Sequence, residues 1–260
     1  MRNFSLILCL LLVFPVVSCA GPVDPSPSTG QFAAPHRCVF IVRDVSESYC
    51  KQLALAQPKL EEILRALGPG DEVTLLDAGL AFQPRSAVRI QSTLPGVPSS
   101  LFQPTRNINE YKKRQQEVDS RWSRANADIA AMVSFVARPV QTERIETDIF
   151  GVFEYISHRV NSPGCEEIYL FPFTDLHHEF KGEATEMPPR ATMAFDRLRV
   201  EAFFLPWINA EQWQAKENAW RQWFVRDGHA TRFAMFDEAA SQKRSPLIKN
   251  RTPRKVPSPF

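Results

Sequence analysis

Cys38-Val-Phe-Ile-Val-Arg-Asp-Val-Ser-Glu-Ser48 is the stretch that decides the fold. Its apolar first half is typical of a short buried strand, and 51–67 follow with apolar residues at helical spacing. A buried strand that leads into a helix through a polar turn is the first unit of a parallel α/β sheet, where ligand sites lie at the carboxyl ends of the strands. Asp44, Ser46 and Ser48 therefore place one carboxylate and two hydroxyls at such an edge. This all-oxygen set suits a hard cation such as Mg2+.

The three residues also suit an ordinary turn or a helix N-cap, so other parts of the chain must decide. Further strand-like segments alternate with helical patterns along the chain. The expected strands after the first are 71–77, 86–92, 167–173, 198–205 and 231–236. The segment 86–92 alternates apolar and polar residues, which indicates an edge strand with one wet face.

Two later polar residues also lie at the start of an expected helix or at the end of an expected strand. Thr147 stands directly before a helical pattern, and Asp175 closes the expected strand 167–173. Thr147 alone suits an N-cap equally well. His177 and His178 follow Asp175, and they suggest an alternative: extra metal ligands, or catalytic groups of a metal-assisted hydrolase. Adjacent histidines on an exposed loop more often point apart.

The order of Asp44/Ser46/Ser48, Thr147 and Asp175 resembles the metal-ion-dependent adhesion site of von Willebrand factor A (vWA) domains. The resemblance covers about 37–239. It implies an α/β fold with a doubly wound, mostly parallel six-stranded sheet and helices on both faces, in which 86–92 is an antiparallel edge strand.

The resemblance also implies a role for each site residue. Ser46, Ser48 and Thr147 would coordinate Mg2+ (or Mn2+ or Ca2+) directly or through water, whereas Asp44 and Asp175 would bind largely through water. An open coordination position would accept an acidic residue of a partner protein, so the protein would be a binding module and not an enzyme. Leu176 replaces the glycine that usually follows the aspartate of the third loop.

The N-terminal segment is typical of a targeting sequence. Residues 1–18 combine a positive start with a short apolar run, and the run is shorter than the roughly 20 apolar residues that a spanning helix needs. The residues before Cys19 resemble a bacterial lipobox, which implies a lipid anchor on Cys19, with outer-membrane sorting toward the periplasm because Ala20 follows. An ordinary secretory peptide cleaved near Ala20 is the alternative. Residues 19–36, rich in Pro and Ser, suggest a tether.

Three cysteines remain after the segment that ends at Cys19. Because Cys38 begins the first strand and Cys165 just precedes another, a bridge between them forms if those strands are neighbours. Cys50 is a competing partner. The spacings match no common zinc motif.

Two further segments complete the predicted organisation. A long helical pattern at 107–137 is an insertion relative to a compact vWA domain, and 240–260 alternates basic residues with Pro and Ser, which predicts a disordered tail. The net charge of +2 and the scattered basic residues give no indication of nucleic-acid binding.

Overall fold

The computed structural model describes residues 36–79, 87–139, 147–161, 164–180, 183–185 and 193–258. The expected signal peptide, the lipid-modified Cys19 and all but the last residue of the tether lie outside these residues. Within them, no helix is both long enough and apolar enough to cross a membrane.

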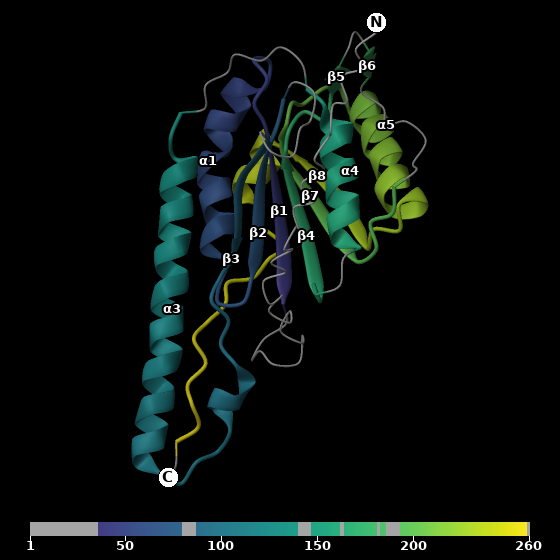
Figure 1. Ribbon diagram of the computed structural model, residues 1–260. Coiled ribbons are helices and arrows are strands. Elements are labelled where there is room, and N and C mark those ends of the chain that lie inside the picture. Colours follow the sequence, from purple (N-terminus) through teal and green to yellow (C-terminus); the bar gives the residue numbers. More distant parts are fainter. Residues whose placement is uncertain are drawn as a thin grey trace, which may run out of the picture.

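A six-stranded sheet forms the centre of the molecule, with strand order β3-β2-β1-β4-β7-β8 (Figure 1). The β2–β3 pair is antiparallel and the other neighbouring pairs are parallel. The strands are β1 (Arg37–Asp44), β2 (Glu72–Ala78), β3 (Val88–Thr93), β4 (Glu167–Phe173), β7 (Leu198–Leu205) and β8 (Arg232–Asp237). This arrangement confirms the predicted fold class.

Helices cover both faces of the sheet, with α1 and α3 on one side and α4 and α5 on the other (Figure 1). A short hairpin, which the sequence did not predict, follows β4. The remaining elements are α1 (Cys50–Arg65), η2 (Ser99–Phe102), α3 (Ile108–Val136), α4 (Ile149–Val160), β5 (His178–Phe180), β6 (Glu183–Thr185), α5 (Ala210–Arg221), the π-helical η3 (Gln222–Asp227) and α6 (Glu238–Lys243).

The central strand β1 is apolar along most of its length because both of its faces are buried. Val39 and Ile41 belong to the core shared with α1 and α3, whereas Phe40 and Val42 belong to the core shared with α4 and α5. Successive side chains of a strand point to opposite faces, so this one strand contributes to both cores. Its polar residues are therefore confined to its two ends.

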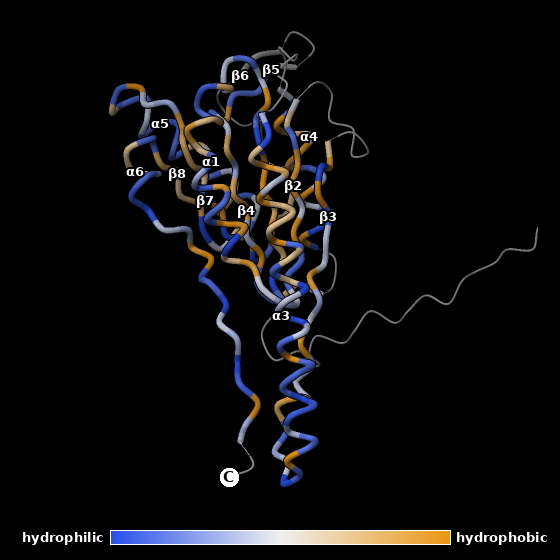
Figure 2. Tube along the Cα trace, turned by 90° about the vertical axis from the view of Figure 1, so that its left-hand side faces the viewer, coloured by the Kyte–Doolittle hydropathy of each residue, from blue (hydrophilic) through white to orange (hydrophobic). Residues whose placement is uncertain are grey.

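Helix α3 is long: its 29 residues, with a rise of about 1.5 Å each, span about 44 Å. Its second half packs on the core, and its first half projects beyond the sheet (Figure 1). Hydrophilic positions dominate this projecting half (Figure 2). A small cluster nevertheless covers its inner side, formed by Val97, Phe102, Val118 and Val256.

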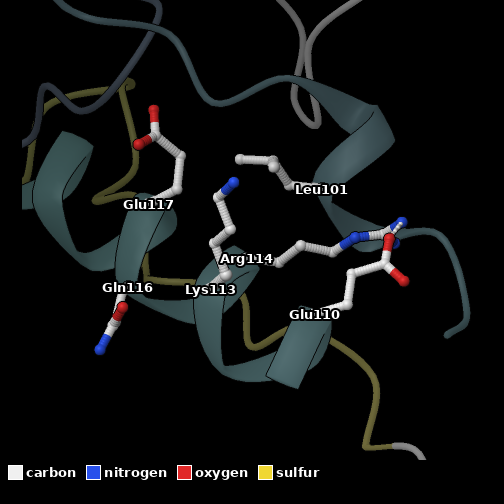
Figure 3. Close-up of a pocket in the computed structure, with 6 residues that line it drawn as sticks. All are labelled: Leu101, Glu110, Lys113, Arg114, Gln116 and Glu117. Carbon is white, nitrogen blue, oxygen red and sulfur yellow. Dashed lines mark hydrogen bonds and ion pairs between the residues drawn. The ribbon is translucent and has the colours of Figure 1, made fainter. Parts of the chain in front are cut away.

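A cavity of about 520 Å³ lies between η2 and the projecting half of α3 (Figure 3). Acidic and basic side chains alternate along its wall, and the ion pair between Glu110 and Arg114 closes part of it. The lining residues are Leu101, Glu110, Lys113, Arg114, Gln116 and Glu117. The mixture of signs indicates a solvated helix surface more than a site for one class of ligand.

Residues 240–258 of the basic C-terminal segment make defined contacts with the rest of the fold, which differs from the prediction of a disordered tail at 240–260. After α6, residues 244–258, here called the C-terminal strap, run in extended form from the sheet to the projecting half of α3. The Leu247 N–H donates to the buried carboxylate of Glu201 at 2.7 Å, and the Val256 N–H donates to Gln115 Oε1 at 3.1 Å. Composition suggested solvation, but contacts with distant residues fix the segment in place.

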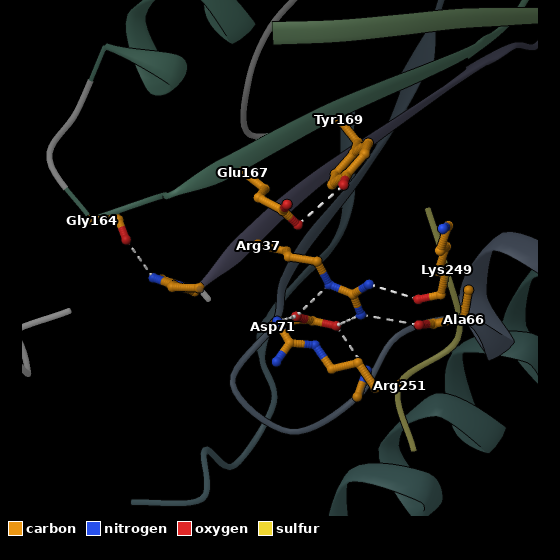
Figure 4. Close-up of polar contacts among 10 residues, drawn as sticks. Arg37, Ala66, Asp71, Gly164, Glu167, Tyr169, Lys249 and Arg251 are labelled. Atoms are coloured by element: carbon orange, nitrogen blue, oxygen red, sulfur yellow. Dashed lines mark hydrogen bonds and ion pairs between the residues drawn. The ribbon is translucent and has the colours of Figure 1, made fainter. Parts of the chain in front are cut away.

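The strongest anchor of the strap is Asp71, whose side chain is fully buried before β2 (Figure 4). Arg251 pairs with Asp71 Oδ1 at 2.8 Å, and Arg37 donates both to Asp71 and to the Lys249 carbonyl, the latter at 2.8 Å. Gly68 leaves room for this contact, because a Cβ there would lie 2.9 Å from the Arg251 side chain. The amino edge of the sheet, where the parallel strands begin, is thus closed by compensated charges.

Candidate metal-binding site

The predicted site residues meet at the opposite edge, where the parallel strands end. Asp44 is the last residue of β1, and Ser46 and Ser48 lie in the turn before α1. Thr147 precedes α4, whose start is held beside β2 because the Asp148 N–H donates to the Gly79 carbonyl at 3.2 Å. Adjacent parallel strands end at one edge, so segments about 100 residues apart in the chain converge there.

Asp44 is the centre of this group, and its side chain is almost completely buried. Its Oδ1 accepts the Ser46 N–H at 2.9 Å and the Thr147 hydroxyl at 3.3 Å. Its Oδ2 accepts the Thr174 hydroxyl at 2.9 Å. The Ser46 and Ser48 hydroxyl oxygens lie 3.1 Å apart. Four of the five predicted residues are therefore connected by hydrogen bonds.

Asp175 lies close enough for its charge to act on Asp44. Burial is the main reason why the pKa of Asp44 rises to about 6, and the negative charge of Asp175 raises it further, while hydrogen bonds from Ser46 and Thr174 oppose the rise. Asp175 Oδ1 also accepts the His177 N–H at 2.8 Å. All the donors that the structure gives to Asp44 are neutral, so its negative charge is only partly compensated.

The third loop turns at Leu176, which stands where the resemblance leads one to expect a glycine. Leu176 has a φ of 58°, in the left-handed region that costs a residue with a side chain roughly 1–2 kcal/mol. Its side chain is fully buried, and its N–H donates to the Thr174 hydroxyl at 3.0 Å. Burial of the leucine and this hydrogen bond offset the backbone cost, so the loop turns as a glycine would allow.

Sequence reasoning missed two residues of the site. The Thr174 hydroxyl donates a hydrogen bond to Asp44. Its position between the expected strand and Asp175 was the sequence feature that could have identified it. Tyr49 is fully buried, and its hydroxyl donates to the carbonyls of Phe203 at 3.1 Å and Phe204 at 3.2 Å. Burial, with the charges of Asp44 and Asp175, raises the pKa of Tyr49 well above its usual value. Tyr49 thereby joins the first loop to the end of β7.

His177 and His178 do not form a group of metal ligands among the described residues. His178 is buried against Phe150, with ring centroids 4.4 Å apart, and its Nδ1 lies 3.9 Å from Asp148 Oδ1. Across the part of the chain that the structure describes, neither histidine belongs to a group of three metal-ligand side chains. The alternative of a transition-metal site at these residues therefore lacks a ligand set.

Two of the three cysteines after Cys19 lie apart from this site. Cys38 and Cys165 form a disulfide at the amino edge of the sheet, because β1 and β4 are neighbours and Cys38 aligns with Ile168. Cys50 is free and begins α1.

The donors at the carboxyl edge fit a hard divalent cation. The group offers carboxylate and hydroxyl oxygens, without a nitrogen or sulfur atom among the predicted ligands, and Mg2+ prefers such donors. A bound cation would also compensate the buried negative charge of Asp44.

The chain is similar to several solved structures at low sequence identity. The chain resembles the ArnB paralog VWA2 from Sulfolobus acidocaldarius at 10% identity and a TM-score of 0.40, over 80% of this chain and 43% of that one. It resembles the pilus adhesin SpaC from Lactobacillus rhamnosus GG at 11% identity and a TM-score of 0.44, over 83% of this chain and 30% of that one. It resembles the SpRpn10 VWA domain at 10% identity and a TM-score of 0.31, over 83% and 92%. The strand order β3-β2-β1-β4-β7-β8, with β3 as an antiparallel edge strand, is the vWA-like architecture that the sequence resemblance implied.

The similarity concerns the fold alone. The chain spans less than half the length of the VWA2 and SpaC chains. No family model matches the sequence, and no curated protein matches it. What the vWA-like domain of this protein does must therefore be argued from its own residues.

Proposed function

We propose that the vWA-like domain binds Mg2+, or Mn2+ or Ca2+ in its place, at the carboxyl edge and thereby binds an acidic residue of a partner protein. Asp44, Ser46, Ser48, Thr147 and Asp175 would hold the cation. The observation that carries this proposal is Asp44: its carboxylate is 1% exposed, receives neutral donors only, and lies beside a second carboxylate. Burial of a charge without a counter-charge is costly, so a cation supplied from solution is the natural complement.

The hydroxyl-rich donor set supports binding of an external acid. Three of the five proposed ligands, Ser46, Ser48 and Thr147, are neutral, and Asp44 and Asp175 would bind largely through water, so no carboxylate of this chain would need to contact the cation directly. When bound, the cation supplies a Lewis-acidic centre that attracts a carboxylate. The loops that carry these residues hold the donors in position through the bonds among Asp44, Ser46 and Thr147.

The proposal also includes the location of the domain. A lipid on Cys19 and the tether at 19–36 would hold it at the bacterial envelope, on the periplasmic side of the outer membrane. In that setting, a domain that recognises an acidic side chain through a cation would serve as an anchored protein-binding module. Two alternatives are a metal-assisted hydrolase and a structural lipoprotein that binds no metal.

Thermal unfolding tests cation binding directly. We expect Mg2+ to stabilise the wild-type chain by about 2.7 kcal/mol at a concentration 100 times its Kd, because it binds the folded state only. Asp44→Asn should remove this effect, whereas Asp128→Asn, on the exposed side of α3, should keep it. Stabilisation that is absent from the wild type would favour the structural alternative, and stabilisation retained in Asp44→Asn would place the cation at another site.

Crosslinking in envelope preparations tests the partner. We expect a crosslinked species that disappears with EDTA and with Asp44→Asn, and that persists with Asp128→Asn. A species that survives both EDTA and Asp44→Asn would contradict cation-dependent binding. Turnover in a phosphatase or esterase screen that is lost with Asp44→Asn would favour the hydrolase.

A further inference from the structure

A second cluster of metal-binding side chains lies at the amino edge, on the far side of the sheet from Asp44. It consists of His36, just before β1, Cys38 in β1 and Glu72 at the start of β2. One ligand atom from each of the three lies within 4.8 Å of the others. Cys38 aligns with Glu72 in the parallel pair β1–β2, so their side chains point to the same face.

His36 is oriented as metal-binding histidines commonly are. Its Nδ1 lies 2.7 Å from the Gly164 carbonyl oxygen, which can only accept, so Nδ1 carries the proton. Its Nε2 is buried and has no hydrogen-bond partner among the residues that the structure describes. A backbone carbonyl that fixes one ring nitrogen while the other remains available is the usual support for a histidine ligand.

Glu72 is supported in a similar way. Arg159, near the end of α4, donates to Glu72 Oε1 at 2.5 Å. Its other oxygen, Oε2, lies 4.0 Å from Cys38 Sγ. One carboxylate oxygen is thus held by a guanidinium, and the second faces the cysteine.

The disulfide prevents this cluster from binding a metal, because a sulfur in a disulfide is not a thiolate ligand. Reduction changes this. Two thiol groups of a reductant convert the Cys38–Cys165 bond into two thiols, and the reductant becomes a disulfide. A divalent cation that binds the two thiols then displaces two protons.

We propose that reduction of Cys38–Cys165 creates a zinc site formed by Cys38, Cys165, His36 and Glu72. Two thiolates, one imidazole and one carboxylate form a tetrahedral donor set of the kind that Zn2+ prefers. Zn–S bonds of about 2.3 Å and Zn–N or Zn–O bonds of about 2.0–2.1 Å require ligand atoms about 3.3–3.8 Å apart. The three atoms that now lie within 4.8 Å of one another need shifts of about 1 Å to reach these separations.

The zinc site does not depend on the proposed Mg2+ function, because the two sites share no residue and the zinc site uses sulfur and nitrogen donors as well as oxygen. Its ligands come from positions 36, 38, 72 and 165. The spacing of these residues along the sequence does not predict the site, because it is the pairing of β1 with both β2 and β4 that brings them together. The protein would hold either a disulfide or a zinc ion at its amino edge.

Cobalt and zinc binding to the full chain tests the proposal. After reduction with a dithiol and anaerobic removal of the reductant, we expect one tightly held Zn2+ per chain. Co2+ in its place should show a thiolate-to-cobalt charge-transfer band. The oxidised chain should bind at least 100-fold more weakly. Equal binding by the reduced and oxidised chains would overturn the proposal.

Matched variants locate the site. Cys50→Ser removes the free cysteine and should leave zinc binding unchanged, as should Asp44→Asn at the other edge. Cys38→Ser should weaken the charge-transfer band, because only Cys165 remains as a thiolate ligand, and His36→Gln or Glu72→Gln should weaken zinc binding at least tenfold. Loss of binding in Cys50→Ser equal to that in Cys38→Ser would show that the metal lies elsewhere.

Circular dichroism separates binding from folding. If the reduced chain unfolds without metal, zinc should restore its spectrum and its thermal transition; failure to do so would overturn the proposal. Cys165→Ser leaves Cys38 as a thiol without disturbing its neighbours in β1. This variant should still bind Co2+ with a weaker thiolate band, and a band that is absent would show that His36, Cys38 and Glu72 do not act together.

Discussion

The two edges of the sheet each bury an aspartate, and they compensate its charge in opposite ways. Asp71, at the amino edge, is fully buried and is paired with Arg37 and Arg251, and it also accepts the Gly68 N–H at 2.8 Å. Asp44, at the carboxyl edge, is equally buried and receives one backbone N–H and two hydroxyls. The chain itself supplies the counter-charges of Asp71. The described donors to Asp44 are neutral, and under the proposed function a cation would supply its counter-charge.

Replacement of each aspartate by asparagine gives the largest expected contrast. Asp71→Asn removes the carboxylate that pairs with both Arg37 and Arg251, and loss of one partner of a buried pair typically costs about 3–5 kcal/mol. Asp44→Asn in EDTA removes an uncompensated charge, so the free energy of unfolding should stay the same or increase. Urea denaturation of the two variants measures both values.

An equal loss of stability in both variants would contradict the distinction between the edges. Asp128→Asn, on the solvent side of α3, controls for the amide substitution itself and should change the free energy of unfolding by less than about 0.5 kcal/mol.

The second contrast is a pH dependence that belongs to the carboxyl edge. The pKa of Asp44 is raised to about 6 in the folded state from a usual value of 3.8. The folded protein therefore binds a proton that the unfolded chain releases, so this contribution is fully present below pH 4 and is lost as pH rises to about 6. The difference of about two units corresponds to roughly 3 kcal/mol.

Denaturation in EDTA between pH 4 and 7 measures this effect. The free energy of unfolding of wild type, minus that of Asp44→Asn, should fall across this range and then level off. Saturating Mg2+ should reduce the fall, because the cation stabilises the ionised carboxylate. A difference that does not change with pH would show that Asp44 is not held in an environment that disfavours its charge.

The residues that meet at the carboxyl edge could be predicted from the sequence, whereas the contacts of the strap at the amino edge could not. Asp44, Ser46 and Ser48 lie on one turn, and strand order places Thr147 and Asp175 near them, so local spacing and fold class were enough to predict where they meet. Whether they bind Mg2+ stays a prediction. The strap could not be foreseen, because Arg251 binds Asp71, 180 positions away along the chain. Its basic residues and prolines are typical of a solvated tail. Contacts with the buried carboxylates of Asp71 and Glu201 hold it against the fold instead.

A third prediction concerns that strap. Arg251→Gln removes one of the two cations beside Asp71, and hydrogen bonds to charged groups contribute about 1.5–3 kcal/mol, so we expect a loss of about 2 kcal/mol. The strap should also become more sensitive to proteolysis. Lys255→Gln removes the same charge from an exposed position four residues away and should change neither property. Equal sensitivity of the two variants would mean that the strap is not anchored through Asp71.

The smallest expected effect lies on the projecting half of α3, where charges are exposed. Glu117 pairs with Arg121 at 2.6 Å, but their side chains are 44% and 31% exposed. Solvent screens such a pair, so Glu117→Gln should cost about 0.3–0.5 kcal/mol, and 1 M salt should remove most of that difference. Salt should leave the cost of Asp71→Asn nearly unchanged, because solvent ions do not reach a fully buried pair. Urea denaturation of both variants at low and high salt therefore distinguishes a buried charge pair from an exposed one. If high salt removed the cost of Asp71→Asn, the amino edge would be open to solvent.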